Sequence, residues 1–312
     1  LFKQISLMET LVKIVPANMF SAFLEGNVLQ IIFLALMFGI AINKRGKKGQ
    51  YVADFFTSLS TVVFSFIQII MKTAPFGIFA LMATVAGKHG IGIISSLIYT
   101  VGVTYISMIM VMVLIYGLGL LLAGLKPIKF FTKMIEAQVV AFSTSSSAAT
   151  LPVNLKISEK YLGIKKNIGS FILPLGSTIN MNGLTAYIGV AVIFSANAYG
   201  INLELADYIK VVFTATLASL GCAGVPAAAL IVLPVVLSSV GIPLEAVGFI
   251  AAIDRLIDML STATNITGDT FTATLVAKSE GQLDIKTYHS NSCDSPLPQS
   301  FNRVQEQTHM AS

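Results

Sequence analysis

The stretch from Ala251 to Asp269 constrains this chain more than any other, because it carries several polar groups on one face of an apolar segment. They recur at helical spacing and are Asp254, Asp258, Thr262, Asn265 and Asp269. A charged side chain at the centre of a bilayer costs about 2.5–3.5 kcal/mol on insertion scales. We therefore expect the stripe to face protein, water or a bound cation, and we interpret it as a binding path.

Composition places the chain in a membrane. Hydrophobic residues make up 55% and charged residues 11% of the sequence, whereas about a quarter of residues are charged in a typical soluble domain. This predicts an all-α, multi-pass integral membrane protein in which the basic residues of short loops set topology. We expect it in the plasma (inner) membrane. The net charge of +5 therefore does not indicate a nucleic-acid partner.

The cysteine content and the first residues further limit the class of protein to which the chain can belong. The 2 cysteines offer neither a disulfide framework nor a metal site, and we expect no catalytic residues and no enzyme cofactor. The chain opens on Leu1 and leads into an apolar run without the layout of a signal peptide. We expect an N-terminally incomplete chain.

Two long apolar spans come first, about Val52 to Ala86 and about Ile91 to Leu125. Both exceed the roughly 20 residues that a crossing helix needs, which predicts tilt or kinks. Lys72 and Pro75 lie within the first span. At the other end, residues 281–312 are polar and are predicted to form a disordered cytoplasmic tail.

Two later apolar regions, about 137–157 and 211–242, have small, polar or glycine-rich centres that read STSSSAATLP and SLGCAGVPAAAL. Such centres are unsuited to a lipid-facing helix. If the first region enters and leaves on one side, the lysines that follow it stay cytoplasmic, as the positive-inside rule favours. We predict two re-entrant helical hairpins, and paired interrupted segments of this kind point to a transporter binding site.

A third interruption, Gly176 to Tyr187, reads GSTINMNGLTAY inside an otherwise apolar span. Asparagine beside glycine favours unwinding, which frees the carbonyl oxygens that sodium prefers. The alternative is a helix-packing motif built from small residues. Likewise, Asp254 has an alternative role as the ion-pair partner of Arg255, and the hairpin tips at Ser145–Ser147 and Gly221–Gly224 have purely structural alternatives.

The runs SSSAATLP, LPLGSTINMNG, GVP and IDM…TNITGD resemble the dicarboxylate/amino acid:cation symporter family, which includes the glutamate and neutral amino acid transporters. The resemblance implies an elevator-type homotrimer that couples sodium to the uptake of a small molecule. Residues 1–125 would be a partial scaffold for trimerisation, with the span from about 91 bridging to a transport domain. That transport domain would be 126–280, with both hairpins.

By position in the family motifs, Asp258 would bind the substrate ammonium. The other implied substrate positions are Ser145, Ser146, Ser147, Val225, Ser261, Thr262 and Asn265. One implied sodium site is Gly176, Asn180, Asn265 and Asp269. A second is Thr178, Met181, Ser219, Leu220 and Cys222.

Three departures from the family pattern bear on substrate and cation. Acidic-substrate members carry an arginine at the position of Ser145 or of Ser261, and Leu184 replaces a threonine. A buried carboxylate without a cation partner is costly, so we expect a neutral amino acid. The alternative is a sodium- or proton-coupled glutamate, aspartate or C4-dicarboxylate symporter. Asn182 replaces an aspartate of a third sodium site, which puts that site in doubt.

Two functions of other classes remain open. An intramembrane aspartyl protease also needs buried acids, although its two acids share a proton across a water, while Asp254 and Asp258 lie one turn apart on one helix. An ion channel would use the same polar stripe. Two closing hairpins suit occlusion of a substrate better than a permanent pore.

Overall fold

The computed structural model describes residues 15–24, 28–73, 76–77, 79–80, 83–84, 87, 90, 92–220, 222 and 224–290. The chain divides into two compact units, residues 1–80 and 81–312. Every named secondary-structure element of the described chain is helical, so the all-α prediction is confirmed there. Each unit is described by itself.

The first unit contains α2 (Met19–Leu24), α3 (Val28–Arg45), a short 3-10 turn (Gly46–Gly49) and α4 (Gln50–Met71). Gly49 permits the tight corner between α3 and α4, because a Cβ there would lie 2.4 Å from the carbonyl oxygen of Ile42. The predicted span from Val52 to Ala86 is not one continuous helix, since α4 ends at Met71 and a turn follows. Pro75 and much of the remainder lie outside the described residues.

The second unit opens with one long apolar helical run. It comprises α6 (Gly92–Met110), a π-helical segment η2 (Val111–Gly117) and α7 (Leu118–Leu122). Together they form a stretch of 31 residues, in which an 18-residue window has a mean hydropathy of 2.4, so it is long and apolar enough to cross a membrane. This confirms a helical span at the second predicted position, and the π-helical turn is its irregularity.

The first hairpin pairs α8 (Pro127–Thr144) with α9 (Ser147–Lys160). Pro127 stands in the first turn of α8, where a missing N–H costs nothing. Ser145 ends α8 in a left-handed conformation with φ of 50°, and the hydroxyl of Ser146 caps α9 by accepting a 3.2 Å bond from the amide of Ala149. The turn falls within the predicted tip, but both helices extend beyond the predicted 137–157.

A broken helix follows, α10 (Lys166–Ile179) and α11 (Asn182–Ala198). The break is at Asn180 and Met181, whose ψ angles of 70° and 52° are not helical. It lies inside the segment predicted to unwind, so that prediction is confirmed. The combined stretch from Lys166 to Ala198 is the other run in the described chain that is long and apolar enough to cross a membrane.

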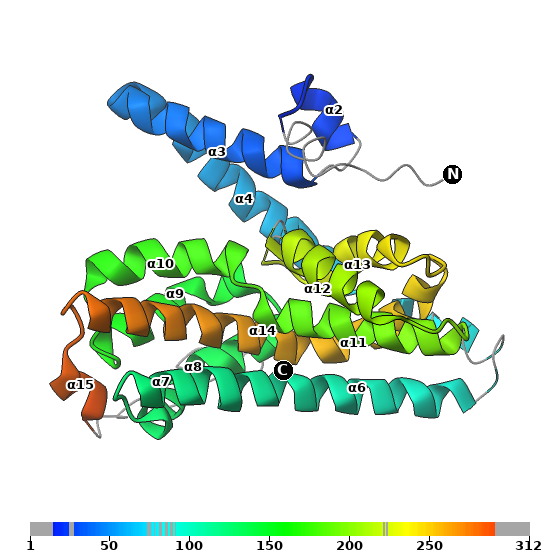
Figure 1. Cartoon of the computed structure of the whole chain (residues 1–312). Helices are drawn as coiled ribbons and strands as arrows, with labels where there is room; N and C mark the ends of the chain where they lie inside the picture. The colour runs from blue at the N-terminus through cyan, green and yellow to red at the C-terminus, as the bar shows by residue number, and fades with distance from the viewer. Residues whose placement is uncertain are drawn as a thin grey trace, which may run out of the picture. The chain divides into compact units, whose positions relative to one another are not determined.

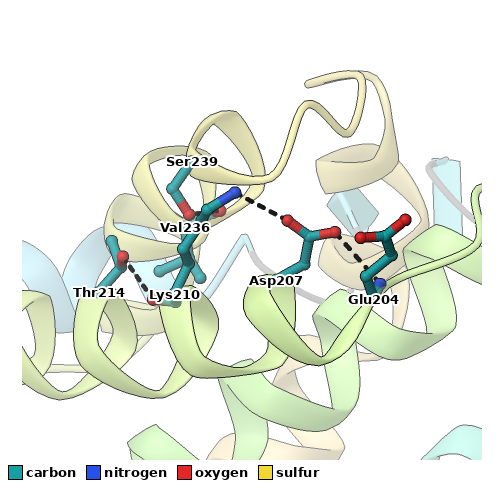
Figure 2. Close-up of polar contacts among 6 residues, drawn as sticks. All are labelled: Glu204, Asp207, Lys210, Thr214, Val236 and Ser239. Carbon is teal, nitrogen blue, oxygen red and sulfur yellow. Dashed lines mark hydrogen bonds and ion pairs between the residues drawn. The ribbon is translucent and has the colours of Figure 1, made fainter. Parts of the chain in front are cut away.

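The second hairpin pairs α12 (Leu205–Leu220) with α13 (Ala228–Ser239). Figure 2 shows the outer ends of both helices, where Asp207 accepts a 2.9 Å bond from Lys210 and a 3.2 Å bond from the amide of Glu204. The bond from Lys210, more than any other contact, lowers the pKa of Asp207. These hydrogen bonds stabilise the first turn of α12 at the exposed end of the hairpin.

The helix α14 (Ala246–Ser279) lies at the centre of the second unit (Figure 1). It contacts α6, η2, α8, α9, α10, α11 and α13. Its first half packs in an apolar core with Leu97, Tyr187 and Val236, and its second half packs in another with Phe130 and Leu173. In a membrane such helices associate by van der Waals packing rather than by the hydrophobic effect, and apolar packing on both halves of α14 surrounds the polar stripe.

The start of the tail is ordered, which corrects the prediction of disorder from residue 281. A short helix, α15 (Ile285–His289), follows α14, with the carboxylate of Asp284 capping its first amides. Tyr288 is fully buried. The ammonium group of Lys133 in α8 donates to the carbonyl oxygens of Tyr161, Thr287 and Tyr288 at 2.7, 2.6 and 2.9 Å. Residues 291–312 lie outside the described chain.

Candidate substrate and cation site

The polar stripe of α14 is enclosed by protein. The side chains of Asp254, Asp258 and Asp269 are 5%, 4% and 1% exposed, and Thr262 and Asn265 are buried beside them. The stripe does not face the outside of the second unit. This confirms the prediction that its carboxylates are sheltered, and each of them then needs a polar partner in the interior.

The tips of the two hairpins touch. The hydroxyl of Ser146 donates a 2.8 Å bond to the carbonyl oxygen of Gly224, and the amide of Ala148 donates to the same oxygen at 3.3 Å. A Cβ on Gly224 would lie 2.8 Å from the carbonyl oxygen of Ser177 and 2.9 Å from the Cβ of Ser147. Glycine is therefore required for this close approach. Gly221, the other predicted tip residue, lies outside the described chain.

Asp258 is joined to the second hairpin. Its carboxylate accepts a 3.0 Å bond from the amide of Ala227, the residue that precedes α13 and has a left-handed φ of 63°. Val225, another predicted substrate position, lies half-buried two residues before it. The structure thus brings the acid of α14 and the tip of the second hairpin into direct contact.

The first predicted cation set converges on Asp269. Asn180 donates its side-chain amide to the Asp269 carboxylate at 2.9 Å, and a Cβ on Gly176 would lie 2.7 Å from the same carboxylate oxygen. The side-chain oxygen of Asn265 accepts a 2.7 Å bond from the amide of Gly183. Hard cations favour carboxylate and carbonyl oxygens of this kind, and all four predicted residues meet at the break between α10 and α11.

The residues of the second predicted cation set differ in burial, and they do not share one common partner in the described chain. Met181 is buried, with its sulfur 3.4 Å from the side-chain nitrogen of Asn265. Ser219 is buried and shares a 2.9 Å hydrogen bond with Thr185 of α11, and Cys222 is buried as well. In contrast, Thr178 and Leu220 are exposed, and the Thr178 hydroxyl bonds to its own helix.

Two hydroxyls in the site have no partner. The side-chain oxygens of Ser145 and Ser261 are buried and form no hydrogen bond with any described residue. Buried polar atoms are normally paired, so an unpaired one calls for a water or ligand. Both serines stand at the positions where the resemblance implies an arginine for an acidic substrate, and Leu184 is buried on α11.

Sequence reasoning missed the role of Arg255. Its Nη2 donates a 3.2 Å bond to the carbonyl oxygen of Ser143 at the end of α8, and its Nη1 is buried without a partner. Asp254 instead accepts a 3.0 Å bond from the hydroxyl of Tyr187. The alternative of an Asp254–Arg255 ion pair is therefore not the contact that the structure shows. A guanidinium group with an open donor lies near the tip of the first hairpin.

Comparisons with known proteins identify the family of the chain. The family model for the sodium:dicarboxylate symporter family matches residues 2–279. A proton/sodium-glutamate symport protein of Bacillus subtilis is 37% identical over 279 residues, 89% of this chain and 65% of that protein. A C4-dicarboxylate transport protein of Rhizobium leguminosarum is 34% identical over 280 residues, 89% of this chain and 63% of that protein.

A proton/glutamate-aspartate symporter of Bacillus subtilis is 31% identical over 278 residues, 89% of this chain and 67% of that protein. The chain spans about two thirds of the length of these relatives, 63% to 67%. The names describe transport proteins, which favours transport over the protease alternative. With the family model covering 278 of its 312 residues, from 2 to 279, this chain belongs to the sodium:dicarboxylate symporter family.

Proposed function

We propose that the chain forms the substrate- and cation-binding part of a secondary active symporter. The observation that carries this proposal is the joint burial of Asp258 and Asp269 between touching hairpin tips and a broken helix. A cation beside Asp269 would offset the charge of the interior, and a substrate beside Asp258 would replace the Ala227 amide. Symport then requires only that the cation binds the loaded, closed state more tightly than the open state.

For the architecture, we propose that both hairpins are re-entrant and that residues 126–280 move as one transport domain of an elevator. The contacts of α14 with both hairpins and with the broken helix support a single moving body. The preceding helices would form the scaffold of a homotrimer. Cross-linking of the protein in membranes tests the trimer, and a purely monomeric pattern would reject it.

For the substrate, the names of the relatives favour glutamate, aspartate or a C4-dicarboxylate, which was the alternative from the sequence. Arg255 supports this choice. Its unpaired Nη1 is a buried donor on the same helix as Asp258, one turn away. A guanidinium group pairs well with a second carboxylate. In this proposal the guanidinium group of Arg255 supplies the positive charge that Ser145 and Ser261 cannot.

A second candidate is a neutral amino acid, favoured by Ser145 and Ser261. Their two unpaired hydroxyls would hydrogen-bond a small polar side chain, and neither carries a charge to pair with a carboxylate. Asp258 suits an ammonium group in either case, which disfavours a plain dicarboxylate. The two candidates therefore differ in whether Arg255 faces the substrate.

The test is uptake by the purified protein in liposomes, with and without a sodium gradient, for aspartate, glutamate, succinate, serine and alanine. If the substrate is acidic, Arg255→Gln lowers its uptake at least tenfold while Ser261→Ala has a small effect. If the substrate is neutral, Arg255→Gln leaves uptake within about twofold, and Ser261→Arg creates binding of aspartate. Uptake of all five solutes that ignores both a sodium gradient and a proton gradient would reject symport.

A further inference from the structure

A chain of hydrogen bonds leads from the π-helical segment to the candidate cation site. The side-chain nitrogen of Asn182 donates to the phenol oxygen of Tyr116 at 3.0 Å and to the side-chain oxygen of Asn180 at 2.9 Å. The side-chain nitrogen of Asn180 then donates to Asp269 at 2.9 Å. We refer to Tyr116, Asn182, Asn180 and Asp269 as the amide chain. Its four members come from η2, the broken helix and α14.

The fold holds Tyr116 firmly in this position. The residue is 1% exposed and its ring stacks on that of Phe271, with centroids 5.0 Å apart. A Cβ on Gly268 would lie 2.6 Å from the Tyr116 hydroxyl, so α14 has no side chain where the phenol enters. The hydroxyl is also 3.4 Å from the carbonyl oxygen of Thr264, to which it donates. Thus Tyr116 is packed on both its ring and its hydroxyl.

The amide chain fixes the direction of every amide in it. Because the Tyr116 hydroxyl donates to Thr264, it offers Asn182 a lone pair, and Asn182 turns its nitrogen toward it. That nitrogen also donates to the oxygen of Asn180, so Asn180 must turn its own nitrogen toward Asp269. If Asn180 were reversed, its oxygen would face the carboxylate, and two nitrogens would face each other. The hydroxyl at one end and the carboxylate at the other therefore favour the same orientation of both amides.

We propose that Tyr116 is a positioning residue for the cation at Asp269, acting through Asn182 and Asn180. The inference rests on the proposed function, because it assumes that the cation binds there. The bond from Asn180 engages one oxygen of the Asp269 carboxylate, Oδ1, and holds the group in a fixed orientation. The other oxygen stays available for the cation. Preorganised ligands of this kind bind with less loss of side-chain freedom.

Asn182 links the two ends of the amide chain, because its side-chain nitrogen donates to both Tyr116 and Asn180. An aspartate at this position has no N–H to donate either to Tyr116 or to Asn180. Asn182 replaces an aspartate of the family pattern, and it is this asparagine that connects Tyr116 to the cation site. It is exposed, whereas Tyr116 and Asp269 are buried, so it can be replaced with little disturbance of packing.

The experiment titrates sodium chloride against potassium chloride on the purified protein without substrate, following the rise in thermal stability. Sodium uptake into liposomes with substrate is the second readout. Tyr116→Phe removes the hydroxyl and keeps the ring, and it should raise the half-effective sodium concentration about five- to tenfold, the effect of one lost hydrogen bond. The half-saturating substrate concentration at saturating sodium should not change.

Tyr105→Phe is the matched control. Tyr105 lies on α6 in the same helical run, and its hydroxyl also donates to a carbonyl oxygen of α14, that of Leu256, at 2.6 Å. It is outside the amide chain, so this variant should keep the sodium response of the wild type. An equal shift in both variants would show a general effect on packing and would overturn the proposal.

Asn182→Leu provides a second route that does not disturb the buried tyrosine. It should shift the sodium response as far as Tyr116→Phe does, and the double variant should shift it no further, because both changes break one chain. Additive shifts, or no shift in either single variant, would overturn the role of Tyr116 while leaving the proposed symport intact. A wild-type protein that sodium does not stabilise would instead reject the cation site itself.

Discussion

The amide of Ala227 donates a 3.0 Å hydrogen bond to the carboxylate of Asp258. This bond joins the first residue before α13 to the middle of α14, which lie 31 positions apart in the chain. Because Asp258 is buried, the bond meets part of its need for a polar partner. The second hairpin therefore rests on the same acid that we assign to the substrate.

From this contact we predict that Asp258→Asn abolishes uptake. Asparagine keeps the shape and can still accept from Ala227, but it has no charge to attract an ammonium group. Loss of a buried charge pair typically costs 3–5 kcal/mol, so uptake should fall more than about 100-fold. Radiolabelled uptake in liposomes measures this, with detergent-solution stability as the check on folding. Full activity of Asp258→Asn would reject the substrate site.

A second prediction concerns the contact between the hairpin tips. In Gly224→Ala, the new Cβ would lie within 2.9 Å of both Ser177 and Ser147, so the tips must separate. Overpacking of this kind costs about 1–3 kcal/mol, and uptake should fall about tenfold. Gly248→Ala is the control, because a Cβ there has no neighbour within 4 Å. Equal uptake by the two variants would show that the tip contact is unimportant.

Gly176 offers a third prediction. A Cβ at this position would lie 2.7 Å from an oxygen of the Asp269 carboxylate, where we place the cation. Gly176→Ala should raise the half-effective sodium concentration at least about tenfold in the same stability titration. Gly189→Ala, which meets no atom within 4 Å, should match the wild type. A sodium response that Gly176→Ala leaves intact would place the cation elsewhere.

The fourth prediction tests Lys133 as the anchor of α15. In Lys133→Met, three carbonyl oxygens lose the donor that they share. The carbonyl oxygen of Thr287 keeps its 2.8 Å bond from the hydroxyl of Ser290. An unpaired buried acceptor costs about 1–3 kcal/mol, so loss of the donor at the other two carbonyl oxygens should lower the free energy of unfolding by about 2–6 kcal/mol. Lys166→Met is the control, since Lys166 is exposed at the start of α10. Thermal unfolding in detergent compares them, and equal melting would contradict the anchor.

The fifth prediction is a pH dependence of α15. Hydrogen bonds from Thr287 and Lys286 hold the pKa of Asp284 below its ordinary value, so the folded state favours the charged carboxylate. The cap is therefore complete above pH about 4 and is lost as the pH falls through the lowered pKa. The protection factors of amides in 281–290, that is, the intrinsic exchange rate at each pH divided by the measured rate, should fall in acid relative to neutral pH. Asp284→Asn, which does not titrate, should show no such step.

Much of the site could be predicted from the sequence, because its signals are local. The spacing from Asp254 to Asp269 identifies one helical face, and asparagine beside glycine marks the break at Asn180. Polar or glycine-rich residues in apolar segments mark the tips at Ser145 and Gly224. Each of these patterns depends on the chemistry of neighbouring residues, and the structure confirms the burial, the break and the turns.

The partners of these residues could not be predicted, because they come from distant parts of the chain. Arg255 contacts Ser143 rather than Asp254, which depends on how α8 packs against α14. No sequence pattern distinguishes Lys133 from the other lysines, yet it binds carbonyl groups up to 155 positions away. Order at α15 depends on that contact, and composition alone therefore predicted disorder.

The π-helical turn from Val111 to Gly117 has a consequence for the rest of its helix. A wider turn accommodates an extra residue and rotates everything after it relative to a regular helix. Within this turn Tyr116 is buried, while Leu114 and Ile115 lie on the outer surface. Deleting one residue from this turn would restore a uniform helical repeat and swing the phenol away from Asn182. The hydrogen bond between Tyr116 and Asn182 thus depends on a local change in the helical repeat.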